Sequence, residues 1–184
     1  MTARTPLERY SKSAARASAV VIRSYSTSFG AATRLLGPKH RSHVRNIYAL
    51  VRVADELVDG VTDGAGLSEQ QQREALDRLE AEVERAIDCG YSSDLIVHAF
   101  AQTAREAHID QGLISPFFTS MRADLAPVSG TAGEGGDAEA AGDAASASDA
   151  ASASGVAPIR AFDAEQHGAY VYGSSEVVGR MCLR

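Results

Sequence analysis

Apolar residues recur at helical spacing from Pro6 to about Leu125, and no segment shows the sustained two-residue alternation of a half-buried strand. The sequence therefore predicts an all-α fold. Ser68 and Gln71 form a capping-box pattern, which opens a helix that ends at Cys89-Gly90. Four apolar residues lie on one side of that helix and predict its buried face: Leu76, Leu79, Val83 and Ile87.

Two further helices are predicted before residue 128. The first runs from Asp94 to Asp110. The second opens at Ser115-Pro116, because proline suits the first turn of a helix, and it ends before Pro127.

The composition changes sharply after this point. Of the 29 residues from 129 to 157, 11 are Ala, 5 Ser and 6 Gly, and the segment has acidic but no basic side chains. Such a segment cannot bury enough apolar surface to offset the entropy lost on ordering. We expect a disordered acidic insertion at 129–157, which divides one domain into residues 1–128 and 158–184. Helical character resumes at Ile159.

The segment from 42 to 59 reads SHVRNIYALVRVADELVD and is apolar nearly all round, which predicts a central helix. On a helical wheel, Asp55 falls within an apolar stripe. Asp59 follows one turn later and Arg52 precedes Asp55 by three residues, so both project beside it. The stripe also contains Val44, Tyr48, Val51 and Val58.

An unpaired charge in a buried position costs about 3–5 kcal/mol, so the acids of this helix need compensation from Arg52, from a metal ion, or from both. Two carboxylates four residues apart are good ligands for Mg²⁺, with Mn²⁺ as the alternative, when they line a cavity. The other interpretation is an ordinary salt-bridged helix face.

Composition excludes several classes of protein. The chain has no Trp and only 6% aromatic residues, which argues against a stacking surface for nucleic acid. Cys89 and Cys182 are too few for a disulfide framework and indicate a reducing compartment. The apolar run from Ala19 to Ile22 is too short for a signal peptide, and no stretch approaches the length of a membrane span. We expect a cytoplasmic protein.

The charge is distributed unevenly along the chain. Residues 1–54 carry a net charge of +9, so the remainder carries −15 of the total of −6. A basic N-terminal part suggests an anionic partner such as phosphate, diphosphate or the inner membrane face, which the protein would contact peripherally. A solvated basic face is the alternative.

Motifs between Tyr25 and Gly60 resemble those of the squalene/phytoene synthase family. The run is YSTSFGAATRLLGPKHRSHVRNIYALVRVADELVDG, and its DELVDG ending is closer to the phytoene synthases. The segments SPFFTSMRADL (115–125) and AYVYGSSEVVGRM (169–181) resemble two later elements of the family. The residues that carry the first match are Ser26, Ser28, Phe29, Leu35, Leu36, Pro38, Tyr48, Arg52, Asp55 and Asp59.

The resemblance implies an isoprenoid-synthase-type helical bundle. It also implies a Mg²⁺-dependent prenyltransferase that condenses two geranylgeranyl diphosphates head to head into phytoene through prephytoene diphosphate. Asp55 and Asp59 would hold the metal, while Tyr170 matches the family's active-site tyrosine. Arg52, Ser26 and Ser28 would bind diphosphate and Tyr48 would line the cavity.

Several of these roles have alternatives. One of the two serines could simply cap the next helix, and Tyr48 could simply pack against its neighbours. Arg41 and Arg45 are either phosphate contacts or solvated charges.

One expected element is absent from the sequence. The family's second acid-rich helix, Asn-x-x-Arg-Asp-x-x-x-Asp, does not occur in these 184 residues. We therefore expect a bundle that is incomplete at the C-terminus and little condensation by this chain alone. The alternative is a non-catalytic helical fragment that binds an anionic membrane or a partner protein. The sequence leaves the substrate chain length, the product and the oligomeric state open.

Overall fold

The computed structural model describes residues 4–125 and 164–184, and every regular element in those ranges is helical. The prediction of an all-α fold is confirmed. The predicted insertion at 129–157, the domain boundaries beside it and the helical restart at Ile159 lie outside the described residues.

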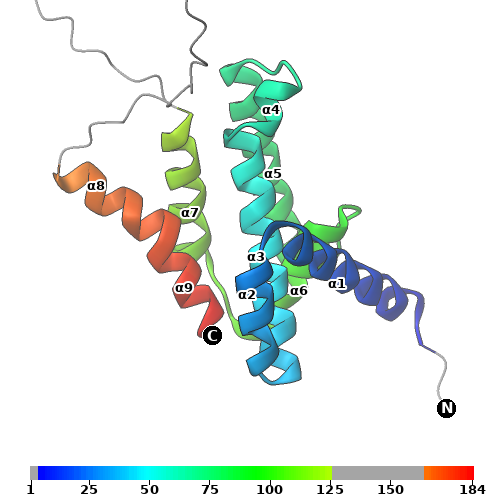
Figure 1. Cartoon of the computed structure of the whole chain (residues 1–184). Coiled ribbons are helices and arrows are strands. Elements are labelled where there is room, and N and C mark those ends of the chain that lie inside the picture. The colour runs from blue at the N-terminus through cyan, green and yellow to red at the C-terminus, as the bar shows by residue number, and fades with distance from the viewer. Residues whose placement is uncertain (1–3, 126–163) are drawn as a thin grey trace, which may run out of the picture.

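Helix α3 is central in this bundle (Figure 1) and packs against α1, α5, α6, α7 and α9. Its central place agrees with its nearly all-round apolar pattern. The elements are α1 (Pro6–Tyr25), α2 (Thr27–Ala32), the 3₁₀ turn η1 (Thr33–Leu35), α3 (Pro38–Val58), α4 (Val61–Gly64), α5 (Glu69–Cys89), α6 (Leu95–Ala107), α7 (Gln111–Asp124), α8 (Ala164–Val171), the π-helical turn η2 (Tyr172–Glu176) and α9 (Val177–Cys182).

Local capping sets the ends of the long helices. The predicted capping box is present at the start of α5, where the Ser68 hydroxyl accepts a hydrogen bond from Gln71 N. The helix ends at Gly90, whose φ of 77° is readily adopted only by glycine. A second capping box, which joins Thr5 and Glu8, opens α1.

One core fills the space between α3 and the helices around it. It contains Ile47, Leu50 and Ala54 from α3, and aromatic side chains from α6 and α7. The stripe of α3 that carries Asp55 is less covered, since Tyr48 is only half-buried. Among the described residues, no helix has both the length and the apolar character needed to cross a membrane.

The start of α7 differs from the prediction. The helix begins at Gln111, where the Asp110 carboxylate accepts a hydrogen bond from Gly112 N at 2.9 Å, and not at Ser115-Pro116. Pro116 therefore lies inside the helix, where it leaves the Gly112 carbonyl without its usual donor. The side-chain cap at Asp110 outweighed the preference of proline for a first turn.

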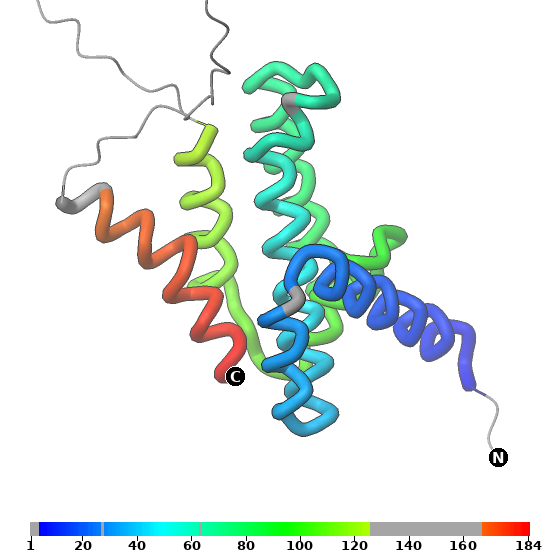
Figure 2. Tube along the Cα trace, viewed as in Figure 1, coloured from blue at the N-terminus to red at the C-terminus, as the bar shows by residue number. Residues whose placement is uncertain are grey.

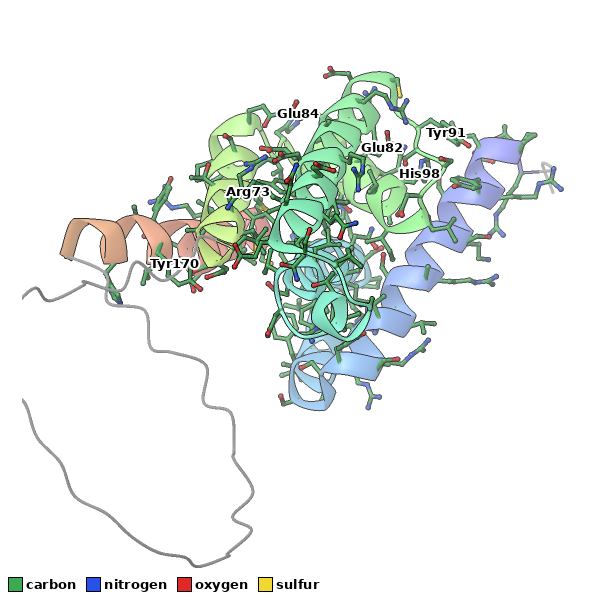
Figure 3. All side chains as sticks on the ribbon, turned by 90° about the horizontal axis from the view of Figure 1, so that it is seen from above. Arg73, Glu82, Glu84, Tyr91, His98 and Tyr170 are labelled. Carbon is green, nitrogen blue, oxygen red and sulfur yellow. The ribbon has the colours of Figure 1, made fainter. Side chains whose placement is uncertain are left out.

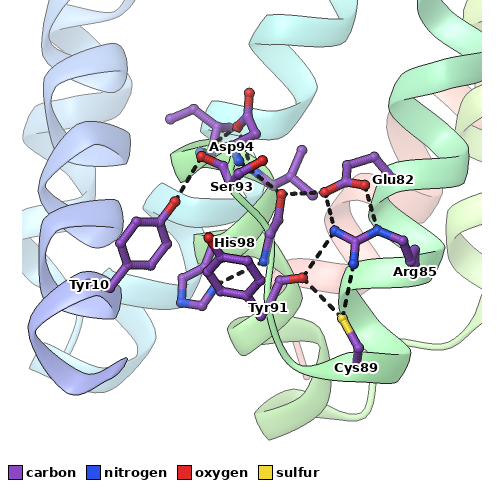
Figure 4. A network of polar contacts seen from close by, with 11 residues as sticks. Tyr10, Glu82, Arg85, Cys89, Tyr91, Ser93, Asp94 and His98 are labelled. Atoms are coloured by element: carbon purple, nitrogen blue, oxygen red, sulfur yellow. Dashed lines mark hydrogen bonds and ion pairs between the residues drawn. The ribbon is translucent and has the colours of Figure 1, made fainter. Parts of the chain in front are cut away.

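A polar network joins the start of α6 to α1 and α5 (Figure 4). His98 is fully buried and accepts a hydrogen bond from Ser92 N at Nδ1, so the neutral ring carries its proton on Nε2, 2.9 Å from Ser11 Oγ. Ser92 Oγ donates to Glu82, and a hydrogen bond from Arg85 is the main cause that lowers the pKa of Glu82 to about 2. The network therefore links α1, α5 and α6 to one another.

The last described segment runs back along α7, as the red and orange end of the tube shows (Figure 2). Gly173, in η2, lies directly against α7. A Cβ at Gly173 would lie 2.5 Å from the Pro116 carbonyl oxygen and 2.6 Å from Ser120 Cβ. Only glycine therefore allows this approach between η2 and α7.

Candidate functional site

Asp55 is a half-buried carboxylate near the C-terminal end of α3. Burial raises its pKa, since the charged form loses solvent, and the charges of Asp124, Asp59 and Glu56 raise it further. The guanidinium of Arg52 opposes this shift only in part. The sequence placed Asp55 on an apolar stripe of this helix, and the structure adds that charged groups surround it.

Asp124 brings a second carboxylate to Asp55 from a different helix. It is the last residue of α7, and its charge is the largest of the acidic contributions that raise the pKa of Asp55. The Tyr170 hydroxyl, on α8, donates a hydrogen bond to Asp124 Oδ2 at 3.4 Å. Figure 3 shows Tyr170 on the α8 side of the bundle, away from His98 and Tyr91. A hydrogen bond thus joins α8 to the end of α7, and the charge of Asp124 acts on Asp55 of α3.

The π-helical turn positions the Tyr170 backbone against α7. The Tyr170 carbonyl accepts hydrogen bonds from Ser120 Oγ at 3.0 Å and from Ser174 Oγ at 2.8 Å. Single π-helical turns within α-helices occur frequently at functional sites. Here the turn lies directly after α8 and holds Tyr170 where its hydroxyl meets Asp124.

Arg52 makes contacts that the sequence did not predict. Its guanidinium forms an ion pair with Glu56, one turn along α3, and lies 4.5 Å from the centre of the Tyr25 ring. Its Nε atom is buried without a hydrogen-bond partner. Arg52 is therefore held between Glu56 and Tyr25, and it keeps one buried donor that a ligand could use.

Two of the predicted diphosphate residues lie on or beside α2. Ser26 Oγ accepts a hydrogen bond from Phe29 N at 3.2 Å, so this serine does cap the helix, and its own proton remains for another acceptor. Ser28 is exposed. Phe29 stacks on Tyr48 with ring centroids 5.3 Å apart, so Tyr48 packs against α2.

Arg45 stands apart from these residues. It precedes Arg52 by seven positions on the same helix, which places it about 10 Å away along the axis. Its charged neighbours are Arg41, Arg23 and Arg34.

Asp124 and Arg73 are candidates that the sequence analysis did not select. The Arg73 guanidinium donates to the Leu125 carbonyl at 3.4 Å, which brings a cation to the end of α7. Asp124 follows Phe117, Ser120 and Met121 on the buried side of α7. That position of an acid is the same signal that drew attention to Asp55.

A comparison with protein families gives the family of the chain. The family model described as squalene/phytoene synthase matches residues 22–184, which is most of the chain. The chain belongs to the squalene/phytoene synthase family. No curated protein and no solved structure gives a match.

Membership of the squalene/phytoene synthase family identifies the general chemistry. The family's reaction is the head-to-head condensation of two prenyl diphosphates, carried out on an all-helical isoprenoid synthase fold. Family members generally use Mg²⁺ for this chemistry. The carboxylates at the end of α3 and α7 are hard oxygen donors, which fits an ion that takes one or two carboxylates together with substrate phosphates. Within the described residues, no three acid, histidine or cysteine side chains are grouped as a metal site.

Replacing Asp55 with asparagine is expected to stabilise this synthase fold near neutral pH. The raised pKa means that the folded chain binds a proton more readily than the unfolded chain, so the ionised form destabilises the fold above that pKa. As the pH falls toward about 4, wild-type Asp55 becomes neutral. The difference in unfolding free energy between the wild type and Asp55→Asn therefore shrinks. Urea unfolding of both chains at the two pH values measures this difference.

Asp88→Asn is the matched control, since Asp88 is an exposed aspartate on a different helix, α5. It should leave the unfolding free energy nearly unchanged. A loss of stability in Asp55→Asn near pH 7 would contradict the account of a buried, poorly compensated charge.

Proposed function

We propose that the chain is a phytoene-synthase-type protein, whose site at the ends of α3, α7 and α8 binds geranylgeranyl diphosphate together with Mg²⁺. The observation that carries the proposal is that Asp124, which accepts a hydrogen bond from the Tyr170 hydroxyl, adds its negative charge to the field at the half-buried Asp55. Negative charge gathered around a half-buried carboxylate favours a cation beside it.

Asp55 and Asp59 would hold the metal ion, which supplies positive charge to the diphosphate leaving group when bound. Asp59 is exposed just beyond the end of α3, and its N–H donates to the Asp55 carbonyl at 2.9 Å. This hydrogen bond keeps the two acids one turn apart. Asp59 is exposed and would meet a ligand that arrives from solvent. Asp55 is half-buried and would hold the ion on the side of the helix bundle.

Arg52 and the two serines would bind the diphosphate oxygens. The unpaired Nε of Arg52 is a donor to a phosphate oxygen, and its ion pair with Glu56 limits the rotation of the side chain. The Ser26 hydroxyl can donate while it caps α2, and Ser28 presents a second hydroxyl nearby in sequence. Together they would favour departure of the diphosphate.

Tyr170 would act on the allylic part of the substrate. Its phenol donates a hydrogen bond to Asp124 Oδ2, and its oxygen would stabilise a positively charged carbon or accept a departing proton. Such a cation survives only where water is excluded. The apolar residues beside Asp55 on α3 and the Tyr48–Phe29 stack would provide that surface.

Binding of a non-hydrolysable thiol analogue of geranylgeranyl diphosphate tests the proposal. The analogue should bind in the presence of Mg²⁺ and lose at least about tenfold in affinity in Asp55→Asn, because a metal-ligand carboxylate is removed. Calorimetric titration with and without a chelator measures both effects. Farnesyl and geranylgeranyl analogues compared side by side would report the preferred chain length.

Asp88→Asn again serves as the control and should bind like the wild type. Binding that is indifferent both to Mg²⁺ and to Asp55 would contradict the proposal. That result would favour the alternative of a helical protein that binds anionic surfaces without catalysis.

A further inference from the structure

Four arginines lie on three segments that pack together around the N-terminal half of α3, and the charges of three of them act on the fourth, Arg45. Arg23 lies in the last turn of α1, Arg34 in η1, and Arg41 and Arg45 in the first half of α3. Burial lowers the pKa of the Arg45 guanidinium, and the charges of Arg41, Arg23 and Arg34 lower it further. Within the described part of the chain, none of the four forms an ion pair with an acid.

Arg41 holds this cluster in place. Its guanidinium donates to three backbone carbonyls, at 3.2 Å to Thr33, 2.7 Å to Arg34 and 2.9 Å to Leu36. These bonds fix the η1–α3 turn and keep Arg34 beside the start of α3. The backbone that carries Arg34 and the guanidinium of Arg41 are therefore fixed by the fold, and the exposed side chains of Arg23 and Arg34 extend beside them.

Arg45 also carries a buried donor without an acceptor. Its Nε atom is buried and has no hydrogen-bond partner. A buried donor left unpaired costs about 1–3 kcal/mol, and nearby like charges add to this cost. One anion with several acceptor oxygens would relieve both, and guanidinium groups bind phosphate through paired hydrogen bonds.

An exposed apolar residue lies beside the cluster. Leu35 is 91% exposed on the turn that Arg41 fixes, directly after Arg34. A single exposed leucine has no special meaning, but next to unpaired arginines it suits the boundary between phosphate headgroups and acyl chains. A phosphate at this place could thus come from a lipid headgroup or from a free anion.

We propose that Arg23, Arg34, Arg41 and Arg45 form a phosphate-binding site separate from the acidic end of α3. Arg45 and Asp55 are ten residues apart on one helix, which corresponds to about 15 Å along its axis. The site needs no divalent metal to bind an anion, since the arginine side chains that form it are themselves cationic. It goes beyond the proposed function and does not depend on it.

The test measures binding of inorganic diphosphate, in the presence of a chelator, and of phosphatidylglycerol vesicles. The Arg23→Gln/Arg45→Gln double variant should weaken whichever of these the wild type binds by at least tenfold. The matched control is Arg9→Gln/Arg78→Gln, which removes two exposed charges from elsewhere on α1 and α5 and should change binding less than twofold.

Leu35→Ala distinguishes the two sources of phosphate. If the source is lipid, this variant should lose vesicle binding and keep any binding of diphosphate; if it is a free anion, diphosphate binds without vesicles and Leu35→Ala changes nothing. Loss of binding with a preserved circular dichroism spectrum excludes unfolding of the double variant. Equal losses in the two double variants, or no binding of either probe by the wild type, would overturn the proposal.

Discussion

Phe118→Ala should lower the unfolding free energy by about 3–5 kcal/mol, the usual range for truncation of a buried phenylalanine. Phe118 lies in α7 with 0% of its surface exposed. Its ring meets that of Phe117 edge to face, with centroids 5.2 Å apart and an angle of 70° between the planes. Truncation removes the buried ring, leaves a cavity and abolishes a ring pair worth about 0.5–1.5 kcal/mol, which is included in that range.

Equilibrium urea unfolding followed by circular dichroism measures the loss, since the chain has no Trp to report on it. Phe29→Ala is the control. Phe29 is 40% exposed and stacks only on Tyr48 at the surface of α3, so its truncation should lower the unfolding free energy by no more than about 1.5 kcal/mol. Similar losses for Phe29 and Phe118 would mean that α7 does not form the core described above.

Helices with a strong local signal could be predicted from the sequence. The capping box at Ser68 and the glycine at position 90 bound α5 as predicted, because both act through hydrogen bonds within a few residues. The predicted start of α7 was wrong by about one turn. Two start signals, Asp110 and Pro116, compete there, and the pattern alone does not rank them.

The candidate site was predictable only in part. The position of Asp55 on an apolar stripe pointed to it, because the spacing of one helix is a local property. The approach of Asp124 depends on how α7 packs against α3, which no periodicity within either helix specifies. The pairing of Arg52 with Glu56, and not with Asp55, is a choice between two acids that are both within reach.

Glu56 itself is informative about the division of charges on α3. Glu56 lies between Asp55 and Asp59 in the sequence, but its charge is neutralised by the ion pair with Arg52. Glu56 therefore fixes the arginine, while the charge of Asp55 remains poorly compensated. The stability expected from Asp55→Asn and the loss of metal-dependent binding in the same variant share this cause.

Gly173→Ala should also destabilise the chain, by about 1–3 kcal/mol, because the new methyl group has no room. The nearest atoms are the Pro116 carbonyl oxygen at 2.5 Å and Ser120 Cβ at 2.6 Å. The first is backbone and cannot move aside without shifting α7. The substitution should therefore separate η2 from α7 and lengthen the contact between Tyr170 and Asp124.

Gly179→Ala and Gly168→Ala are the matched controls, since a Cβ at either position meets no described atom within 4 Å beyond its own stretch of helix. Both lie in helices, where alanine is favoured over glycine by about 1 kcal/mol, so each should be neutral or stabilising. Urea unfolding gives the three stabilities, and amide exchange in α8 and α9 reports whether the segment leaves α7. If Gly173→Ala proved as stable as Gly179→Ala, the close approach of η2 to α7 would not exist, and Tyr170 would lose its support beside Asp124.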